Sequence, residues 1–361
     1  MQIKKILLLI GTRPEAIKMA PLIRELRSRP QHCEVWAAGS GQHKDTVREA
    51  LALFGIHLDA EIPWQASAHL IELHTRLLSA CHALIGQFQP DMVLVQGDTS
   101  TAFAGAWAAF YSGIPVGHVE AGLRSGSLES PFPEEMHRIQ IARLAAWHFA
   151  PTESARQNLL SEGISPDRIW VCGNTGIDAL HIALEKIRKG GTASAVDSNK
   201  IKITATLHRR ENQPFLEKIC RDLLELLQNE RFELDFVLHP NPAVQARVRP
   251  ILEGHACIRL HPPLDYLRFL QLLDGSSLII TDSGGIQEEA PTLGKPVVVL
   301  RSHTERTELI ESGGGILCDP LTGNLQEAVQ QAENNIAKET PENPFGDGRA
   351  ARRIAEVVIN L

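Results

Sequence analysis

Aromatic side chains and positive charge are both scarce in this sequence. Phe, Tyr and Trp together make up only 5% of the 361 residues, which leaves few rings for the base-stacking platforms of proteins that bind single-stranded nucleic acid. Lys and Arg number 36 against 43 Asp and Glu, so the formal net charge is −7. Because nucleic acids and anionic membranes are bound by clustered basic faces, the composition argues against both as main partners.

Long apolar runs and paired cysteines are absent as well. The apolar stretch at 102–111 is much shorter than the roughly 18 residues that cross a membrane, and the run at 6–10 is too short for a signal-peptide core. The six cysteines lie far apart, with no C-x-x-C pair. Because scattered thiols are typical of reduced proteins, the sequence predicts a cytoplasmic location.

The histidines do not fall into metal-binding patterns. The sequence has 15 of them but contains neither H-x-H nor H-x-x-x-H. It also has no cluster of Cys and His at the spacing of zinc ligands. We therefore predict no metal site.

Short apolar runs alternate with longer helical patterns along the chain, which is typical of a parallel sheet covered on both faces. At roughly 150 residues per domain, the length suggests two such units. The pattern predicts strands at 3–10, 35–38, 91–96, 114–119, 202–207, 232–239, 277–281 and 296–300. Helices are predicted at 14–26, 69–88, 101–111 and 350–359. The expected fold is α/β, with two doubly wound, Rossmann-like domains facing a cleft.

The boundary between the two domains is predicted near residues 171–175. The first domain then spans 1–172 and the second spans 173–349, and the break at 343–348 precedes the last helix. Ligands bind at the carboxyl ends of the strands in such sheets. The turns that follow the strands are therefore the places to look for chemistry.

The first of these turns runs from Gly11 to Glu15. Thr12 and Glu15 have the spacing of a capping box, and Pro14 suits the start of a helix. Arg13 is unusual there, because a cation at a helix amino terminus opposes the helix dipole. It is better explained by an anion bound at this turn, although a simple helix start remains the alternative.

A second turn, at 281–289, has the features of a phosphate site. Gly284 and Gly285 allow close approach of a ligand to the backbone N–H groups that open a helix. The Ser283 hydroxyl can add a donor, and Glu289 can accept hydrogen bonds from a ribose diol. The spacing fits a plain Ser-Gly helix cap equally well, because short glycine motifs have many false positives.

Three acids stand near strand ends on one side of the first sheet. Asp98 follows the strand at 91–96, Glu120 follows the strand at 114–119, and Glu134 lies in the next loop. Asp98 also suits a helix N-cap, and Glu134 a solvated loop. Glu120 is harder to explain structurally, because a carboxylate that ends an apolar strand must find donors. Together, the three point to acid–base chemistry.

The second domain offers a cationic strand end. His208 is followed directly by Arg209 and Arg210, after the strand at 202–207. Adjacent arginines suit a diphosphate, and a histidine suits proton transfer near neutral pH.

Taken together, these turns resemble one family, the bacterial non-hydrolysing UDP-N-acetylglucosamine 2-epimerases, which interconvert UDP-N-acetylglucosamine and UDP-N-acetylmannosamine. The matching stretches are GTRPEAIKMAPL at 11–22, GQH at 41–43, GDT at 97–99, HVEAGLR at 118–124, PFPEE at 131–135, HRREN at 208–212, HPNP at 239–242, TDSGGIQEEAP at 281–291 and TER at 304–306. The resemblance implies the two-domain GT-B fold, UDP in the interdomain cleft and a homodimer. It also implies that the final helix, 350–361, packs back on the first domain and that no cofactor is needed.

The resemblance also implies a mechanism. Carbon 2 of the sugar is not next to a carbonyl, so its proton is removed together with departure of UDP, and UDP adds back after protonation on the other face. Asp98, Glu120 and Glu134 can share the roles of base and acid, with His208 as a further catalytic group. The UDP-binding residues implied are Arg13, His208, Ser283, Gly284, Gly285 and, for the ribose, Glu289.

Many bacterial members of the family bind a second UDP-N-acetylglucosamine as an activator. The matching positions here are Gln42, His43, Arg209 and His239, which makes them candidate allosteric residues. The chain departs from the family pattern after the P-E-E motif. Met136-His137-Arg138 replaces the usual Ala-Asn-Arg.

The sequence leaves three other functions open. A UDP-dependent glycosyltransferase of the same fold commonly needs one base, which leaves two of the three acids unexplained. A hydrolysing epimerase would release N-acetylmannosamine and UDP. An inactive nucleotide-sugar sensor would be expected to lack one of the four catalytic candidates, and all four are present.

Overall fold

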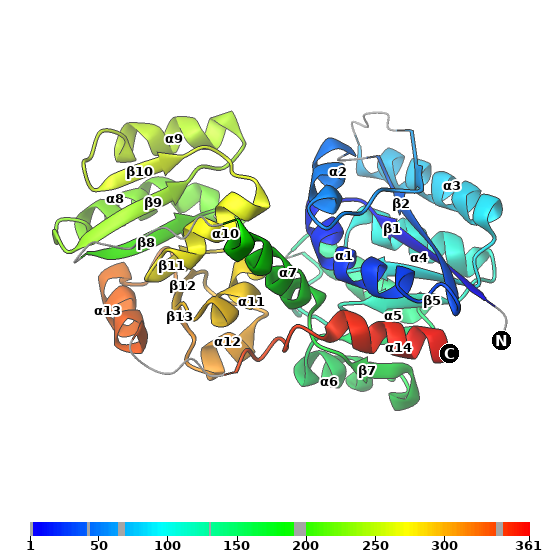
Figure 1. Cartoon of the computed structure of the whole chain (residues 1–361). Helices are drawn as coiled ribbons and strands as arrows, with labels where there is room; N and C mark the ends of the chain where they lie inside the picture. Colours follow the sequence, from blue (N-terminus) through cyan, green and yellow to red (C-terminus); the bar gives the residue numbers. More distant parts are fainter. Residues whose placement is uncertain (1–2, 42–43, 64–68, 130, 191–199, 337–341) are drawn as a thin grey trace. The chain divides into compact units, whose positions relative to one another are not determined.

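The computed structural model describes residues 3–41, 44–63, 69–129, 131–190, 200–336 and 342–361. Contacts divide the chain into unit 1, Met1–Ile182 with Phe345–Leu361, and unit 2, Ala183–Pro344 (Figure 1). The division falls inside helix α7 (Thr175–Lys189), about ten residues after the position expected from the sequence. The start of α7 belongs to unit 1 because Asp178 caps the last helix of the chain. Its carboxylate accepts hydrogen bonds from the backbone N–H groups of Ala350 and Ala351.

Unit 1 is built on a seven-stranded parallel sheet in the order β3-β2-β1-β4-β5-β6-β7. Its strands are β1 (Lys4–Ile10), β2 (Cys33–Gly39), β3 (Ala60–Glu61), β4 (Met92–Gln96), β5 (Val116–Val119), β6 (Trp147–Ala150) and β7 (Ile169–Val171). Its helices are α1 (Arg13–Arg27), α2 (Lys44–Ala52), α3 (Leu70–Phe88), α4 (Ser100–Tyr111), α5 (Glu134–Leu144), α6 (Glu153–Ser161) and α14 (Ala350–Asn360), with a short 3-10 turn η1 (Pro166–Arg168).

The last helix packs on unit 1. Helix α14 lies against α1, and Lys4 Nζ donates to the carbonyl of Val358 at 2.9 Å. The buried positions of α14 recur on one face, at Ala351, Ile354, Ala355 and Val358. This spacing is that of an amphipathic helix, so burial of its apolar face holds the chain end against the first unit.

Unit 2 repeats the plan with six parallel strands in the order β10-β9-β8-β11-β12-β13. The strands are β8 (Ile201–Thr206), β9 (Phe232–Val237), β10 (Ile258–His261), β11 (Leu278–Thr281), β12 (Val297–Leu300) and β13 (Gly315–Cys318). The helices are η2 (Arg210–Phe215), α8 (Leu216–Leu226), α9 (Pro242–Leu252), α10 (Tyr266–Asp274), α11 (Gly284–Leu293), α12 (Thr307–Glu311) and α13 (Leu325–Ile336).

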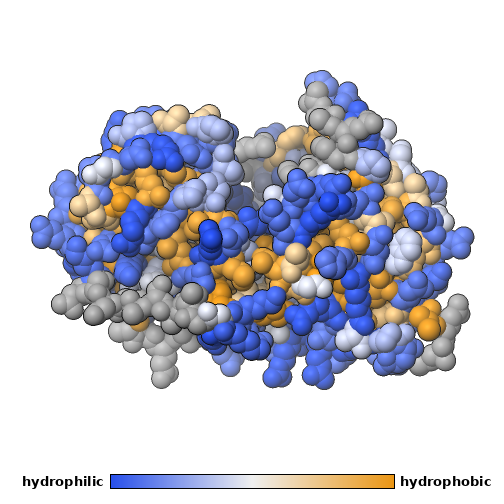
Figure 2. All heavy atoms as spheres, turned by 45° about the horizontal axis from the view of Figure 1, so that its top comes forward, coloured by the Kyte–Doolittle hydropathy of each residue, from blue (hydrophilic) through white to orange (hydrophobic). Residues whose placement is uncertain are grey.

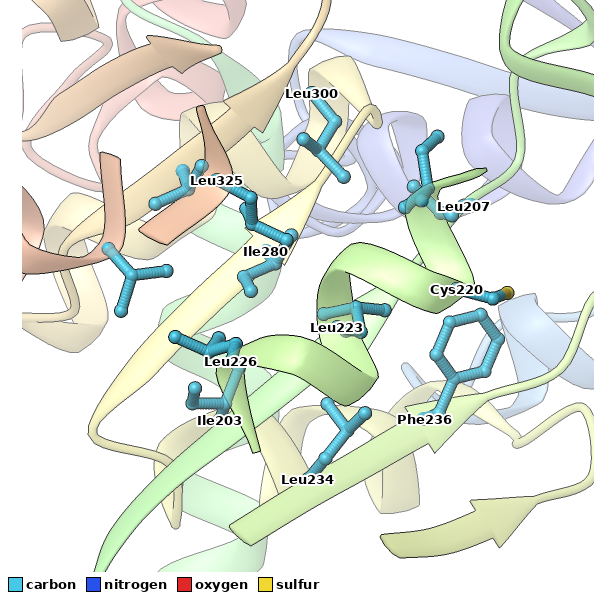
Figure 3. Close-up of a cluster of buried hydrophobic side chains, with 14 of the residues drawn as sticks. Ile203, Leu207, Cys220, Leu223, Leu226, Leu234, Phe236, Ile280, Leu300 and Leu325 are labelled. Carbon is cyan, nitrogen blue, oxygen red and sulfur yellow. The ribbon is translucent and has the colours of Figure 1, made fainter. Parts of the chain in front are cut away.

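The core of unit 2 forms where helices cover the sheet. Ile203 and Leu234 of adjacent strands pack with Leu223 of α8, and all three are buried (Figure 3). Helix α8 buries every third or fourth residue, which is the pattern of a helix with one apolar face. Outside the cores, hydrophilic residues cover much of the visible surface of each unit, with apolar residues between them (Figure 2).

The predicted α/β class with two doubly wound sheets is confirmed. The structure adds five short strands that the sequence analysis did not place: β3, β6, β7, β10 and β13. All of them lie at or next to a sheet edge. Edge strands are buried on fewer sides, so their sequences lack the continuous apolar run that marks a central strand. Among the described residues, no helix combines the length and apolarity needed to span a membrane.

Two histidines are buried in the sheet of unit 1. His118 of β5 and His148 of β6 are paired across the strands, and both are 0% exposed. His118 Nε2 lies 2.8 Å from the carbonyl oxygen of Gly97, whereas neither ring nitrogen of His148 has a hydrogen-bond partner among the described residues. Burial lowers the pKa of His118 to about 4 and that of His148 to about 3. Both rings are therefore neutral in the folded protein at pH 7.

Replacing His148 with Phe is expected to stabilise the protein increasingly as the pH falls. Below about pH 6.5 the unfolded chain binds a proton at His148 that the folded chain does not, which costs up to about 1.4 kcal/mol per pH unit. The variant lacks this loss, so its advantage in unfolding free energy should grow at that rate between pH 6.5 and 5. Urea unfolding at several pH values measures it.

The unfolding free energy of the variant must be compared with that of the parent at each pH, because Glu15 also makes the stability depend on pH. Burial raises the pKa of Glu15 to about 7, so its contribution to stability increases as the pH falls, opposite to that of His148. His57 provides the control, since its side chain is exposed and loses little hydration on folding. The His57→Phe variant measures the effect of the same substitution at a solvent-exposed position. A constant difference for His148→Phe would contradict the prediction.

Candidate active site

The carboxyl ends of β4 and β5 bring two of the predicted acids into adjacent loops. Gln96, the last residue of β4, is paired with Val119, the last residue of β5. Glu120 follows Val119 directly, and Asp98 follows Gln96 after one glycine, Gly97. Because the strands are parallel and in this register, both acids lie at the same edge of the sheet of unit 1.

Glu120 is held by a cation and an amide in a rare backbone conformation. Its carboxylate forms an ion pair with Lys18 Nζ of α1 at 2.5 Å and accepts a hydrogen bond from the Gln96 side chain. Its φ is 64°, in the left-handed region that residues other than glycine seldom adopt. Such strain persists where the surrounding structure enforces it, and it is frequent at functional sites.

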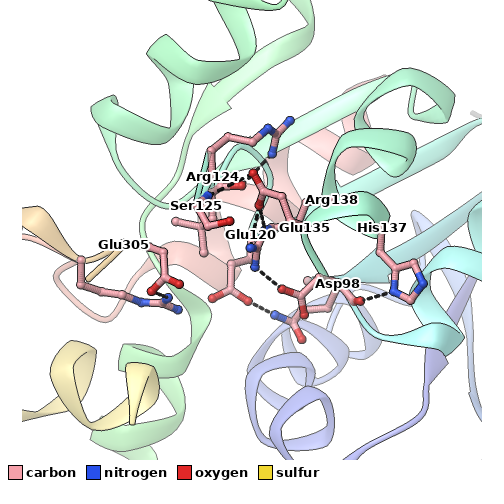
Figure 4. A network of polar contacts seen from close by, with 12 residues as sticks. Asp98, Glu120, Arg124, Ser125, Glu135, His137, Arg138 and Glu305 are labelled. Carbon is pink, nitrogen blue, oxygen red and sulfur yellow. Dashed lines mark hydrogen bonds and ion pairs between the residues drawn. The ribbon is translucent and has the colours of Figure 1, made fainter. Parts of the chain in front are cut away.

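Asp98 is paired with a buried arginine. Arg138 Nη1 of α5 donates to Asp98 Oδ2 at 2.5 Å, and Arg138 Nε donates to Glu135 Oε2 at 2.8 Å (Figure 4). The Arg138 side chain is only 6% exposed. The other oxygen of Glu135 accepts the backbone N–H groups of Ser125 and Gly126. One arginine therefore joins the loop after β4 to α5 and, through Glu135, to the loop after β5.

Glu134, the third acid, is the first residue of α5 and is half-buried. A carboxylate at this position is favoured by the helix dipole. Helix α5 is tied to the Asp98 turn at two successive residues, because His137 Nδ1 lies 2.7 Å from the Asp98 carbonyl oxygen and Arg138 binds the Asp98 carboxylate. The structure thus links the helix that begins with Glu134 to the turn that carries Asp98.

The predicted turn at the end of β1 forms the expected capping box. Glu15 Oε2 accepts the backbone N–H groups of Gly11 and Thr12, and the Thr12 side chain accepts from the N–H of Glu15. Glu15 Oε1 also accepts a hydrogen bond from Thr99 Oγ1, at the start of α4. A Cβ on Gly11 would lie 2.1 Å from an atom of Thr101 in α4, so only glycine fits there. Glu15 therefore fixes the turn of Arg13 to the turn after β4.

In unit 2, Asp282 connects two of the loops that follow strands. Its carboxylate accepts the backbone N–H groups of His208 and Arg209 at 2.8 and 3.0 Å and a hydrogen bond from Asn212. The loop after β8 is thereby fixed to the loop after β11. His208 Nε2 is 2.6 Å from Thr206 Oγ1, and burial lowers the pKa of His208. The ring is therefore neutral at pH 7.

The predicted phosphate turn opens α11. Ser283 is the N-cap residue, but its hydroxyl does not cap the helix, which leaves the first N–H groups of the helix without that acceptor. A Cβ on Gly284 would lie 2.9 Å from the guanidinium carbon of Arg306, so a larger residue there would displace that side chain. Arg306 donates to Glu288 Oε1 at 2.8 and 3.0 Å. Glu289 Oε1 accepts the Tyr266 hydroxyl at 2.9 Å.

Arg306 also belongs to a buried network of ion pairs around Glu305. Arg301, which is 2% exposed, donates to Glu211 Oε1 at 3.0 Å and to Glu305 Oε2 at 2.8 Å. Burial alone would raise the pKa of Glu305, but the hydrogen bond from Arg301 and the neighbouring arginine charges hold it well below its usual range. Glu305 therefore stays ionised and fixes the positions of the cations around it.

The candidate allosteric residues are only partly described. Gln42 and His43 lie outside the described residues. Arg209 and His239 lie beside His208: the rings of His208 and His239 are 5.4 Å apart, and the three residues help to line one small cavity. Within the described ranges, no group of three His, Cys, Asp or Glu side chains is placed to hold a metal ion.

Comparison with known proteins decides the family. A family model described as UDP-N-acetylglucosamine 2-epimerase matches residues 24–359. The UDP-N-acetylglucosamine 2-epimerase of Salmonella typhimurium is 42% identical over 370 residues, which cover 98% of both chains. The chain belongs to the UDP-N-acetylglucosamine 2-epimerase family. The resemblance inferred from the motifs is thereby confirmed.

Solved structures of the epimerase family agree with this assignment. The UDP-GlcNAc 2-epimerase of Neisseria meningitidis, solved bound to UDP-GlcNAc, has a TM-score of 0.93 at 41% identity and covers 99% of this chain and 100% of its own. The Methanocaldococcus jannaschii enzyme, solved in complex with UDP-GlcNAc and UDP, has a TM-score of 0.84 at 33% identity with the same coverage. The two-domain fold expected for the family is therefore confirmed.

The structure of this epimerase-family chain also identifies residues to which the sequence analysis gave no role. They are Lys18, His137, Arg138 and Asp282, each bonded to a candidate site residue or to its turn, and Arg306, which is bonded to Glu288 of the helix that follows the phosphate turn. A weak signal existed for Lys18, which interrupts a run of buried residues in α1. Asp282 stands inside the glycine-rich motif itself. Nothing in the local sequence indicates that His137 and Arg138 reach the turn after β4.

Proposed function

We propose that this chain catalyses the reversible epimerisation of UDP-N-acetylglucosamine to UDP-N-acetylmannosamine at carbon 2, without net hydrolysis. The observation that carries the proposal is the placement of Asp98 and Glu120 at neighbouring strand ends with different cationic partners, Arg138 and Lys18. Two carboxyl groups at one edge of the sheet, each held by its own partner, are the arrangement that an acid and a base acting on one substrate require.

In the proposed reaction, one carboxylate removes the proton from carbon 2 while the bond from carbon 1 to the diphosphate oxygen breaks. The electron pair of the C–H bond forms a double bond between the two carbons, and UDP leaves with the electrons of the C–O bond. A carboxylic acid then protonates carbon 2 on the opposite face, and UDP adds back to carbon 1. Asp98, Glu120 and Glu134 share these proton transfers in the proposal.

The proposal assigns the nucleotide to Arg13 and to the residues of the phosphate turn that opens α11. The N–H groups at Gly284 and Gly285 and the hydroxyl of Ser283 hold the departing diphosphate. Neutral His208 serves as a donor to the diphosphate, and Glu289 accepts a hydrogen bond from the ribose. The solved relatives bound to UDP-GlcNAc and UDP support a nucleotide sugar as the ligand.

Incubation with UDP-N-acetylglucosamine in heavy water tests the proposed reaction. Deuterium should enter carbon 2 of both epimers, and the two nucleotide sugars should reach a constant ratio without accumulation of UDP. A product without deuterium would overturn the elimination route. Sustained release of UDP with free N-acetylmannosamine would show a hydrolysing epimerase instead, and transfer only to an added acceptor would show a glycosyltransferase.

Arg13→Ala is expected to weaken UDP binding about 10- to 100-fold, the usual cost of one hydrogen bond to a charged group. Titration calorimetry with UDP measures the change. Arg24→Ala is the matched control, because Arg24 lies on the exposed side of the same helix. Equal affinities of the two variants for UDP would remove Arg13 from the proposed site.

We also propose that the chain acts as a cytoplasmic homodimer, with Arg209 and His239 belonging to an activator site. Free cysteines at all six positions support a reducing compartment. Light scattering should give about 79 kDa, twice the 39.7 kDa of one chain, and a mass of one chain would contradict the dimer.

Cell fractionation tests the location. A rate that rises hyperbolically with UDP-N-acetylglucosamine would contradict activation.

A further inference from the structure

A histidine that belongs to none of the assigned roles is bonded to the turn of Asp98. His137 lies in the first turn of α5, is 1% exposed, and places Nδ1 2.7 Å from the main-chain oxygen of Asp98 (Figure 4). A carbonyl oxygen only accepts hydrogen bonds, so Nδ1 must carry the hydrogen. The contact therefore defines the tautomer of the ring and gives the Asp98 carbonyl a donor.

The His137 ring is held in place by side chains of two other helices. It is stacked on Phe103 of α4, with ring centroids 4.7 Å apart and planes 15° apart. His74 of α3 lies 5.1 Å away, and its own Nε2 is 3.0 Å from Ser100 Oγ at the start of α4. A ring packed in this way cannot turn freely, so the direction of its N–H bond is set by the packing.

His137 and its neighbour act on different parts of the same residue. Arg138 binds the Asp98 carboxylate, and His137 binds the Asp98 main chain. The arginine supplies charge, whereas the histidine determines where the backbone of the turn lies. Because proton transfer requires reacting atoms at a defined separation, a displacement of about 1 Å can cost a factor of about 100 in rate.

Burial favours an uncharged His137 ring, whereas the acids near it favour a charged one. Asp98 and Glu134 are the acids that act on it, Arg138 is the neighbouring cation, and His74 faces it from α3. Burial lowers the pKa of His137 despite the two acids. A neutral ring holds the turn without forming an ion pair with either acid, so the ion pair of Asp98 with Arg138 is left undisturbed.

We propose that His137 is a positioning residue for the epimerisation, which fixes the Asp98 turn through its Nδ1–H group while it rests on Phe103. This role rests on the proposed function. It goes beyond that function, because the proposal gives His137 no contact with the substrate and lets it act through Asp98. The competing explanation is that His137 only fills space between α3, α4 and α5.

Two substitutions separate these explanations. His137→Asn keeps an N–H donor near the position of Nδ1 but loses the ring, whereas His137→Phe keeps the ring and its stacking but loses the donor. If His137 positions Asp98, the Phe variant should lose about 10- to 100-fold in kcat with little change in KM. The Asn variant should remain within about fivefold of the parent in kcat, because the hydrogen bond is what matters.

The test also needs a control variant and a check that each variant is folded. His82→Phe makes the same substitution at an exposed position of α3 and should leave kcat unchanged. Circular dichroism melting shows whether each variant is folded. A folded Phe variant with the parental kcat, or an Asn variant that loses as much as the Phe variant, would overturn the positioning role while the parent still epimerises. Failure of the parent itself to form UDP-N-acetylmannosamine would instead overturn the proposed function.

Discussion

Asp98→Asn is expected to lower kcat by about 100- to 10,000-fold, the usual contribution of a positioned acid or base. Asparagine has nearly the shape of aspartate and can still accept a hydrogen bond from Arg138, but it cannot take up or release a proton. The same argument applies to Glu120→Gln, which keeps an acceptor for Lys18. Turnover of UDP-N-acetylglucosamine, followed by NMR, measures both effects.

UDP affinity should change little in either variant, because the proposal assigns the nucleotide to other residues. Glu49→Gln is a suitable control, since Glu49 is an exposed acid of α2 in the same unit. It should retain the activity of the parent. Normal turnover of Asp98→Asn or Glu120→Gln would remove that acid from the mechanism, and a large loss of UDP affinity would show that it binds the nucleotide instead.

Arg138→Met should destabilise the protein by about 3–5 kcal/mol, because removing one partner of a buried ion pair leaves its charges uncompensated. Here the uncompensated groups are Glu135, which is 2% exposed, and Asp98. Methionine keeps an apolar chain of similar length, so a cavity contributes little. Urea unfolding gives the free energy, and kcat should fall as well because Asp98 loses its counter-charge.

The double variant Arg138→Met with Glu135→Gln identifies the cause of this loss. If the loss comes from the unpaired Glu135 charge, neutralising that carboxyl should restore part of the stability. It should not restore kcat, because Asp98 still lacks its partner. A single Arg138→Met variant within about 1 kcal/mol of the parent would show that the pair is no stronger than an exposed one.

Several parts of the fold were predictable because they depend on local patterns. The central strands β1 and β4 are buried and apolar at 6–10 and 92–95, so each shows a continuous apolar run, and the turn at Gly11 shows the spacing of a capping box. The edge strands β3 and β13 were not placed, because a short run of two to four residues has no reliable period. Their existence depends on pairing with the preceding strands, β2 and β12.

The candidate site was predictable to the extent that strand ends were. Asp98, Glu120 and His208 each follow a predicted strand, and in doubly wound sheets ligands bind at those ends. Their partners were not predictable, because each comes from another element. Lys18 is 102 residues from Glu120, and Arg138 is 40 residues from Asp98. No local pattern indicates such a contact.

By itself, the sequence determined the α/β class, the family and the identity of the groups at the ends of the strands, because each of these follows from local periodicity and short motifs. Only the tertiary structure decided which cation neutralises which acid, that Glu120 adopts a left-handed backbone, and that a histidine of α5 binds the main chain of Asp98. The physical reason is that charge pairing and hydrogen bonding act over a few ångströms in space, whatever the separation along the chain.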